Sequence, residues 1–155
     1  MSDGLITFTL GERNYATPLT EVLEVVRLQG LAELPGMAAP LAGVIDLRGA
    51  ALPVLDLRVG ADADSRGDVL VVENDATKLG VAVDRVRAVV ERAELSSAGS
   101  AAEDGLLPAY VVEVLRDARG PIFLVDLAAM VRGARGAGAG LDDLATIPPG
   151  EAAAG

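Results

Sequence analysis

The chain contains two copies of one apolar pattern, which constrains its fold more than any other feature. Residues 5–26 align with residues 69–90 at a constant spacing of 64 positions and without a gap. The matched apolar pairs include Phe8 with Val72, Tyr15 with Leu79, Leu19 with Val83, Val22 with Val86, and Val26 with Val90. Gapless register over so many apolar positions predicts a duplicated module whose copies share one architecture.

A second repeat is built around two Arg-Gly pairs. The stretch GVIDLRGAALPVLDLR at residues 43–58 holds two apolar strands joined at Arg48-Gly49, where glycine permits a tight bend. The stretch RGPIFLVDL at residues 119–127 repeats the bend, the apolar run and the closing Asp-Leu. The bend predicts that Arg48 lies at the rim of a sheet.

The order of elements predicts an all-β fold. Short alternating strands are separated by Gly and Pro turns, and only a turn near Thr20 and a short helix over residues 128–132 are helical. Two copies of about five strands each suggest two small β-barrels that share a core.

The domain is expected to span residues 1–132, and its boundaries follow the two copies. Its first subdomain is predicted over about 12–67 and its second over about 68–132. The alternative that both subdomains share the N-terminal strand is left open. Residues 133–155 are rich in Gly and Ala, which is typical of a flexible tail.

Composition excludes several classes of function. The chain of 155 residues is 51% hydrophobic but has only two Phe, two Tyr and no Trp, so its core should be aliphatic. A net charge of −10 without a Lys/Arg cluster argues against nucleic-acid binding, which needs clustered cations. The absence of His and Cys excludes disulfides, thiolate metal sites, a Ser-His triad and phosphohistidine. Without a signal peptide or a membrane-length apolar run, the chain is expected to be cytoplasmic and not inserted into a membrane.

The polar residues give no sign of catalysis. The chain has no phosphate-binding loop, so we expect no enzymatic activity, no metal and no cofactor. Four carboxylates near strand ends favour turn or cap stabilisation over an acid/base or metal site: Asp46, Asp56, Asp84 and Asp126. Val22 and Val86, at matched positions, either belong to the core or line a groove for an amphipathic helical partner.

Several motifs taken together resemble the CheW family of chemotaxis coupling proteins. The resemblance runs from about Leu5 to Val131 and is specific because the motifs occur in order and at the family's spacing. They are FTLG at 8–11, Tyr15, EVLEVV at 21–26, LPG at 34–36, GVIDLRG at 43–49, LPVLDLR at 52–58 and GVAVDRV at 80–86.

The resemblance implies two intertwined five-stranded, SH3-like barrels and a non-enzymatic adaptor. Such an adaptor links the cytoplasmic tip of methyl-accepting chemoreceptors to the regulatory domain of the histidine kinase CheA, and is recruited to membrane-associated receptor arrays. The receptor helix is expected in a groove between the subdomains, lined or supported by Val22, Glu24, Val25, Arg48, Val69, Gly80 and Val86. Ala51, just past the Arg48-Gly49 bend, is the only named candidate for binding the kinase.

Two departures from the family pattern leave alternatives open. Ala16 and Glu113 stand where glycine is usual, and Glu113 makes the second subdomain the less typical half. The chain could therefore be a paralogous scaffold of a non-motility signalling array. A CheV protein would need a receiver domain after Gly133, and a chain that starts at Met1 without kinase modules disfavours a detached CheA regulatory domain. A small-ligand-binding β-barrel or an undetected hydrolase also fits an all-β fold.

Overall fold

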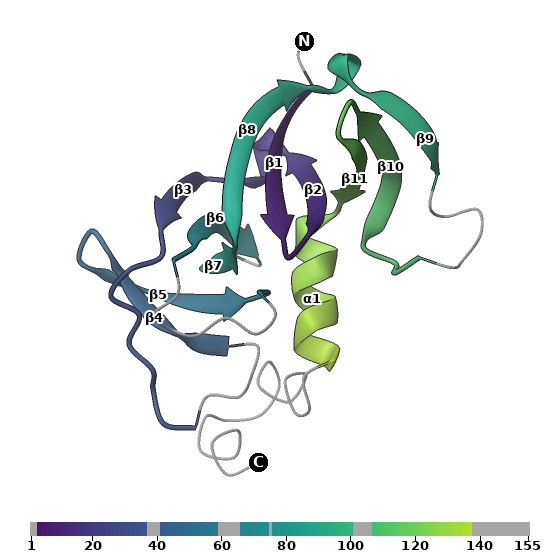
Figure 1. The fold of residues 1–155 in the computed structure, drawn as a ribbon. Helices are drawn as coiled ribbons and strands as arrows, with labels where there is room; N and C mark the ends of the chain where they lie inside the picture. Colours follow the sequence, from purple (N-terminus) through teal and green to yellow (C-terminus); the bar gives the residue numbers. More distant parts are fainter. Residues whose placement is uncertain (1–2, 37–40, 59–65, 75, 101–106, 138–155) are drawn as a thin grey trace.

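A computed structural model describes residues 3–36, 41–58, 66–74, 76–100 and 107–137. Within these residues eleven strands, two 3-10 turns and one α-helix follow one another along the chain (Figure 1). The elements are β1 Gly4–Leu10, β2 Arg13–Pro18, η1 Leu19–Glu21, β3 Glu24–Arg27, β4 Leu41–Leu47, β5 Ala50–Asp56, β6 Asp68–Asn74, β7 Thr77–Val83, β8 Arg85–Glu91, η2 Arg92–Glu94, β9 Ser96–Ser100, β10 Val111–Asp117, β11 Gly120–Val125 and α1 Leu127–Ala137.

The strands form two sheets, and the all-β fold class is confirmed. One sheet has six strands in the order β8-β1-β2-β11-β10-β9, and the other has five in the order β3-β6-β7-β5-β4. Pairing is antiparallel except between β2 and β11 and between β5 and β7, which are parallel. The two parallel pairs occupy matching places, so the sheets are built on one plan.

The two copies of the repeat exchange their first hairpins. The hairpin β1–β2 belongs to the first copy but joins β8, β10 and β11 of the second. In return, the hairpin β6–β7 of the second copy joins β3, β4 and β5 of the first. The predicted boundary between the subdomains, near residue 67, falls just before β6. Because of the exchange, each sheet contains strands from both sides of this boundary. The exchange makes the two halves intertwined.

The strand bounds reproduce the repeat. β6 begins and ends 64 residues after β1, as the sequence alignment predicts. For the second pair of hairpins the spacing is 70, because Leu47 pairs with Ala50 and Asp117 pairs with Gly120. Both hairpins carry a bulge at the same place, after Leu41 and after Val111.

This register corrects the comparison of the two Arg-Gly bends. With a spacing of 70, Arg119 matches Gly49, and Ala118 matches Arg48. The repeated Arg-Gly letters are therefore displaced by one residue, since strand pairing and the bulge fix the register rather than the dipeptide.

Glu113 takes the place of Gly43 because the two sheets differ at this point. A Cβ at Gly43 would lie 2.3 Å from the carbonyl oxygen of Ala32, so only glycine fits there. In the six-stranded sheet, β9 pairs with β10 at this point instead. Glu113 accepts hydrogen bonds from the Arg92 guanidinium and, at 2.6 Å, from the Ser97 hydroxyl, which hold β9 in place. The hydrogen bond from Arg92 lowers the pKa of Glu113.

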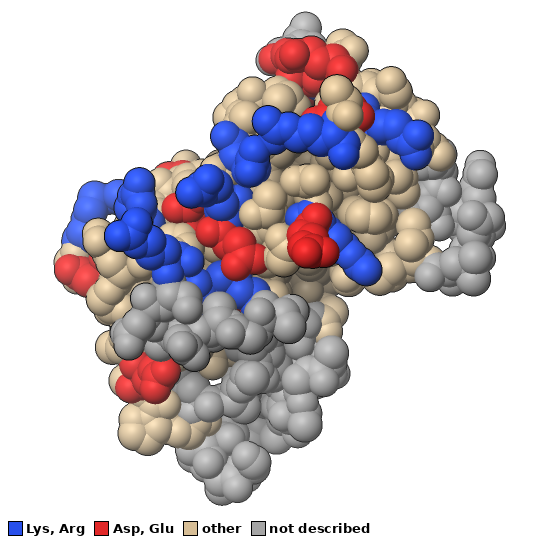
Figure 2. All heavy atoms as spheres, in the orientation of Figure 1, with Lys and Arg blue, Asp and Glu red and all other residues tan. Residues whose placement is uncertain are grey.

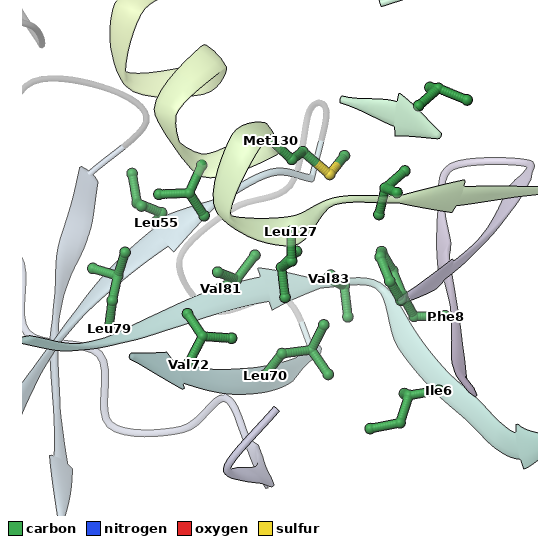
Figure 3. Close-up of a cluster of buried hydrophobic side chains, with 13 residues drawn as sticks. Ile6, Phe8, Leu55, Leu70, Val72, Leu79, Val81, Val83, Leu127 and Met130 are labelled. Carbon is green, nitrogen blue, oxygen red and sulfur yellow. The ribbon is translucent and has the colours of Figure 1, made fainter. Parts of the chain in front are cut away.

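Three hydrophobic clusters, mostly of aliphatic side chains, form the core. One lies on the inner side of each sheet, and a larger central cluster lies between the sheets beneath α1 (Figure 3). The buried members of the central cluster come from both sheets and the helix: Ile6, Phe8, Leu55, Leu70, Val72, Leu79, Val81, Val83, Val111, Val125, Leu127, Met130 and Val131. Burial of apolar surface from both copies in one cluster joins them into a single unit.

The helical elements differ from the sequence prediction. α1 continues to Ala137, past the predicted end at residue 132 and into the segment assigned to the tail. Its residues Leu127, Met130 and Val131 recur at helical spacing and pack on the central cluster, which outweighs the low helix propensity of Gly133. Residues 138–155 lie outside the described residues. The helical turn predicted near Thr20 is the 3-10 turn η1, which starts after Pro18, so Thr20 lies inside the turn and does not cap it.

Gly80 and Ala16 occupy equivalent positions and provide a matched test of packing. A Cβ at Gly80 would lie 2.8 Å from Cγ1 of Val69, whereas Ala16 carries its methyl group fully buried. We expect Gly80→Ala to lower the free energy of unfolding by about 1–3 kcal/mol through overpacking. Ala16→Gly should cost less, about 0.5–1 kcal/mol, mainly through chain entropy. Urea unfolding of both variants measures the difference, and an equal or larger loss in Ala16→Gly would contradict it.

Candidate protein-interaction site

The predicted receptor-binding residues gather around the edge strand β3 and the start of β8. Glu24 and Val25 lie in β3, and Val22 lies two residues before its start. Arg48 lies in the β4–β5 turn of the same sheet, while Val86 lies on the edge strand of the other sheet. Residues from both sheets therefore approach one region of the surface.

Arg48 is aimed at β3 by an unusual backbone conformation. Arg48 and Gly49 both have positive φ, 50° and 89°, as in the two-residue turns that suit twisted hairpins. The Asp46 carboxylate accepts a hydrogen bond of 2.8 Å from the Gly49 amide and closes the turn. The turn holds the guanidinium against Glu24 of β3, the strand at the opposite edge of the same sheet from β4.

Arg48 and Glu24 form a two-pronged ion pair across the rim of the five-stranded sheet. Nη1 of Arg48 donates to Oε1 of Glu24 at 2.8 Å, and Nη2 donates to the other carboxylate oxygen. This hydrogen bonding lowers the pKa of the Glu24 carboxyl, with a smaller contribution from Lys78. The side chains remain 66% and 30% exposed, so water screens the pair and its main effect is to fix orientation.

The side chains of Val22 and Val86 are neither fully buried nor fully exposed to solvent. Both are half-buried and pack against the central cluster from its rim. The Val86 amide donates a hydrogen bond of 2.8 Å to the Asp68 carboxylate, which ties the start of β8 to β6 of the other sheet. The two alternatives, core or groove, are thus combined at the rim.

The remaining predicted residues fall into two groups. Val69 is fully buried and Gly80 lies against it, so these two residues support the surface from inside. Val25 is 42% exposed on β3. Ala51, the kinase-binding candidate, is exposed on β5 opposite Asp46.

Two exposed apolar residues near this surface escaped the sequence analysis. Leu23 is 52% exposed and lines a cavity of about 250 Å³ between η1, the end of β6 and α1. Glu21, in the same cavity, has its pKa raised by burial and by the nearby Asp126. Val89 is 60% exposed and matches Val25 at the spacing of 64. Applying the spacing of 64 residues to Val25 would have identified Val89.

The four carboxylates near strand ends have structural partners. Each accepts a hydrogen bond that closes a turn, a strand end or a helix start: Asp46 from the Gly49 amide, Asp56 from Arg58, Asp84 from the Gly11 amide and Asp126 from the Ala129 amide. Among the described residues no group of three or more acidic side chains could hold a metal ion. In the same part of the chain, no helix is long and apolar enough to cross a membrane.

The surface charge is uneven. Although the chain carries a net charge of −10, Lys and Arg side chains extend across the face that carries β8 and reach over both sheets (Figure 2). Arg85 and Arg87 of β8 are both exposed. An acidic or amphipathic partner segment would find complementary charge beside apolar residues on this face.

These features define a duplicated two-sheet β protein whose rim exposes apolar and charged side chains. The CheW-like domain family model matches residues 4–135. The chain therefore belongs to the CheW-like domain family, which is a family of chemotaxis scaffold proteins.

Individual relatives agree with this assignment. The chemotaxis protein CheW of Treponema pallidum is 26% identical over 95 residues, covering 56% of this chain and 56% of the relative. The protein PilI of Pseudomonas aeruginosa is 35% identical over 86 residues, covering 52% of this chain and 48% of the relative. The chain thus spans about half the length of the curated relatives it matches.

A solved structure shows the same fold. The crystal structure of the scaffolding protein TtCheW from Thermoanaerobacter tengcongensis superposes with a TM-score of 0.65 at 24% sequence identity. The superposition covers 82% of this chain and 86% of TtCheW.

Proposed function

We propose that this protein is a non-enzymatic adaptor that couples chemoreceptors to a CheA-type histidine kinase. The observation that carries the proposal is membership of the CheW-like family over residues 4–135, which include both sheets and most of α1. Receptor binding would bring this cytoplasmic adaptor to membrane-associated arrays.

The receptor-binding surface is proposed at the rim formed by β3, the β4–β5 turn and the start of β8. Val22, Val25 and Val86 would offer apolar contacts to a helical receptor tip, as in helix-in-groove recognition. The Arg48–Glu24 pair would present a fixed guanidinium beside them. Val69 and Gly80 would act from the interior by holding β6 and β7 together.

The kinase-binding surface is proposed around Ala51. Ala51 lies on the strand that follows the Arg48-Gly49 turn and is exposed. A small exposed residue lets a partner backbone approach closely, so Ala51→Arg should obstruct kinase binding more than receptor binding.

A pull-down of the two partners tests the proposal. Immobilised protein is incubated with the regulatory domain of a CheA-type kinase or with a soluble helical hairpin of a receptor tip. We expect both to be retained, and the Ala51→Arg variant to lose the kinase while it keeps the receptor fragment. Retention of neither partner by the folded wild-type protein would contradict the adaptor function.

A scaffold for a non-motility signalling array is the second candidate. The match to PilI of Pseudomonas aeruginosa, at 35% identity over 86 residues, supports this candidate beside the matches to chemotaxis CheW proteins. Competition between receptor fragments from the two kinds of array, both from the organism that encodes this chain, distinguishes the candidates.

A further inference from the structure

A cavity of about 290 Å³ opens at the rim of the six-stranded sheet. It lies between β8 and the turn that joins β10 to β11, and strands β1 and β2 complete it. The lining residues are Thr7, Asn14, Arg87, Ala88, Val90, Leu95, Asp117, Arg119 and Ile122.

This cavity is the counterpart of the Arg48–Glu24 ion pair in the other sheet. Glu24 pairs with Val71 in β6 as Ala88 pairs with Thr7 in β1, so position 88 corresponds to Glu24. By the spacing of 70, position 118 corresponds to Arg48 and is also alanine. Two alanines thus stand where the five-stranded sheet has a carboxylate and a guanidinium. Because these side chains are smaller, space is left at the rim.

Two arginines border the space, but no acidic side chain stands at the position that matches Glu24. The register of β1 and β8 shifts between Thr7 and Phe8, which pair with Ala88 and Val86 and leave Arg87 as the extra residue of a bulge. Arg119 reaches the cavity from the β10–β11 turn. Within the described ranges neither Arg87 nor Arg119 forms an ion pair, and both are exposed.

The other polar groups of the cavity are compatible with an anion. The Thr7 hydroxyl donates to the Ala88 carbonyl at 3.2 Å, and Asn14 of the adjacent strand β2 is a second polar residue of the lining. Asp117 is the acidic residue of the lining, and its Oδ1 already accepts a hydrogen bond of 2.7 Å from the Arg119 amide. The formal charge of the lining is therefore +1.

We propose that this cavity receives an aspartate or glutamate side chain of a protein partner, which takes the place that Glu24 fills in the other sheet. A carboxylate would gain charge-assisted hydrogen bonds from Arg87 and Arg119, of the kind that guanidinium groups make in two-pronged geometry. A side chain is favoured as the source because the filled counterpart holds one. The proposal is independent of which receptor or kinase the chain binds.

Titration with N-acetyl-glutamate amide tests the proposal, since this probe carries only the side-chain carboxylate. At constant ionic strength, NMR follows the Nε–Hε signals of the arginines. We expect saturable shifts for Arg87 and Arg119 and smaller, non-saturating ones for Arg85 and Arg116, which are exposed on β8 and β10 outside the cavity. N-acetyl-glutamine amide, which is neutral, should shift none of the four.

A variant that fills the cavity from within provides the second test. Ala88→Glu should pair with Arg119 or Arg87, show a carboxyl pKa below the usual value for Glu, and abolish the response to the probe. Ala88→Gln has the same size without charge and should keep the response. Equal shifts at all four arginines, or a response that survives Ala88→Glu, would overturn the proposal, and neither result depends on the adaptor function.

Discussion

Replacing Leu70 with alanine is expected to lower the free energy of unfolding by about 2–5 kcal/mol, the range for truncating a fully buried leucine. Leu70 is completely buried in the central cluster, where it faces side chains from both sheets and from α1 (Figure 3). The variant loses transfer free energy and leaves a cavity that rigid neighbours fill only in part. Urea unfolding followed by circular dichroism measures the loss.

The same variant tests whether the hairpin exchange makes the fold one cooperative unit. Each sheet contains strands from both copies, so neither sheet can form fully while the other copy is unfolded. Amide hydrogen exchange should therefore accelerate in both sheets of Leu70→Ala, by the same change in free energy. Val112→Ala, at a residue 49% exposed on β10, serves as the control and should stay within about 0.5 kcal/mol of the wild type. Acceleration confined to the five-stranded sheet would show that the halves unfold separately.

The sequence predicts the duplication well because side-chain periodicity reports directly on strands. The spacing of 64 recovers β1 with β6 and β2 with β7, since alternating apolar residues mark the buried face of each. The exchange of hairpins is not readable in the same way. The two copies carry nearly the same apolar pattern, so β3 could pair with β1 or with β6 as far as the pattern is concerned.

The change of spacing from 64 to 70 is also invisible to periodicity. Extra residues before β10 accommodate β9, whose sequence SSAGS has none of the apolar alternation of the other strands. β9 takes the place of the isolated bridge between Ala32 and Val44 in the other sheet. Small side chains are sufficient because β9 is an edge strand held by backbone pairing and by Glu113.

The candidate site residues were named from the sequence, but the burial of each side chain could not be predicted from it. The sequence placed Arg48 at a sheet rim because of the following glycine, and the structure puts it in a turn between paired strands. The sequence pattern could not distinguish Val69, which is fully buried, from Val25, which is 42% exposed, since both are valines in apolar strands. Exposure depends on which strands lie at the edges of the sheets, and that order follows from the exchange.

Replacing Arg48 with alanine is expected to weaken binding of a receptor-tip fragment by about ten-fold or more, the effect of losing an interface hot spot. The melting temperature should change little, because the Arg48 side chain is 66% exposed and screened by water. An arginine fixed by Glu24 can offer its remaining N–H groups to a partner without first losing rotamer freedom. Isothermal titration beside a thermal melt separates the two quantities.

A double-mutant cycle with Glu24 distinguishes direct contact from bracing. If Arg48 contacts the receptor and Glu24 only orients it, Glu24→Gln should weaken binding less than Arg48→Ala, and the double variant should resemble Arg48→Ala. If the pair instead braces the rim, both single variants should lose stability, and the double variant should recover part of it because no charge is left alone. Arg48→Lys serves as the control for charge, since lysine cannot donate to both carboxylate oxygens in the observed planar geometry.

The pH dependence of the cycle gives an independent check. The pKa of Glu24 is lower in the folded protein than its usual value, so the contribution of the pair is present above the unfolded pKa and is lost as the pH falls through the folded one. Receptor affinity of the wild type should therefore be constant around neutral pH and decline only in acid, whereas Glu24→Gln should lack that decline. Unchanged receptor binding and stability in Arg48→Ala would remove Arg48 from the interaction site.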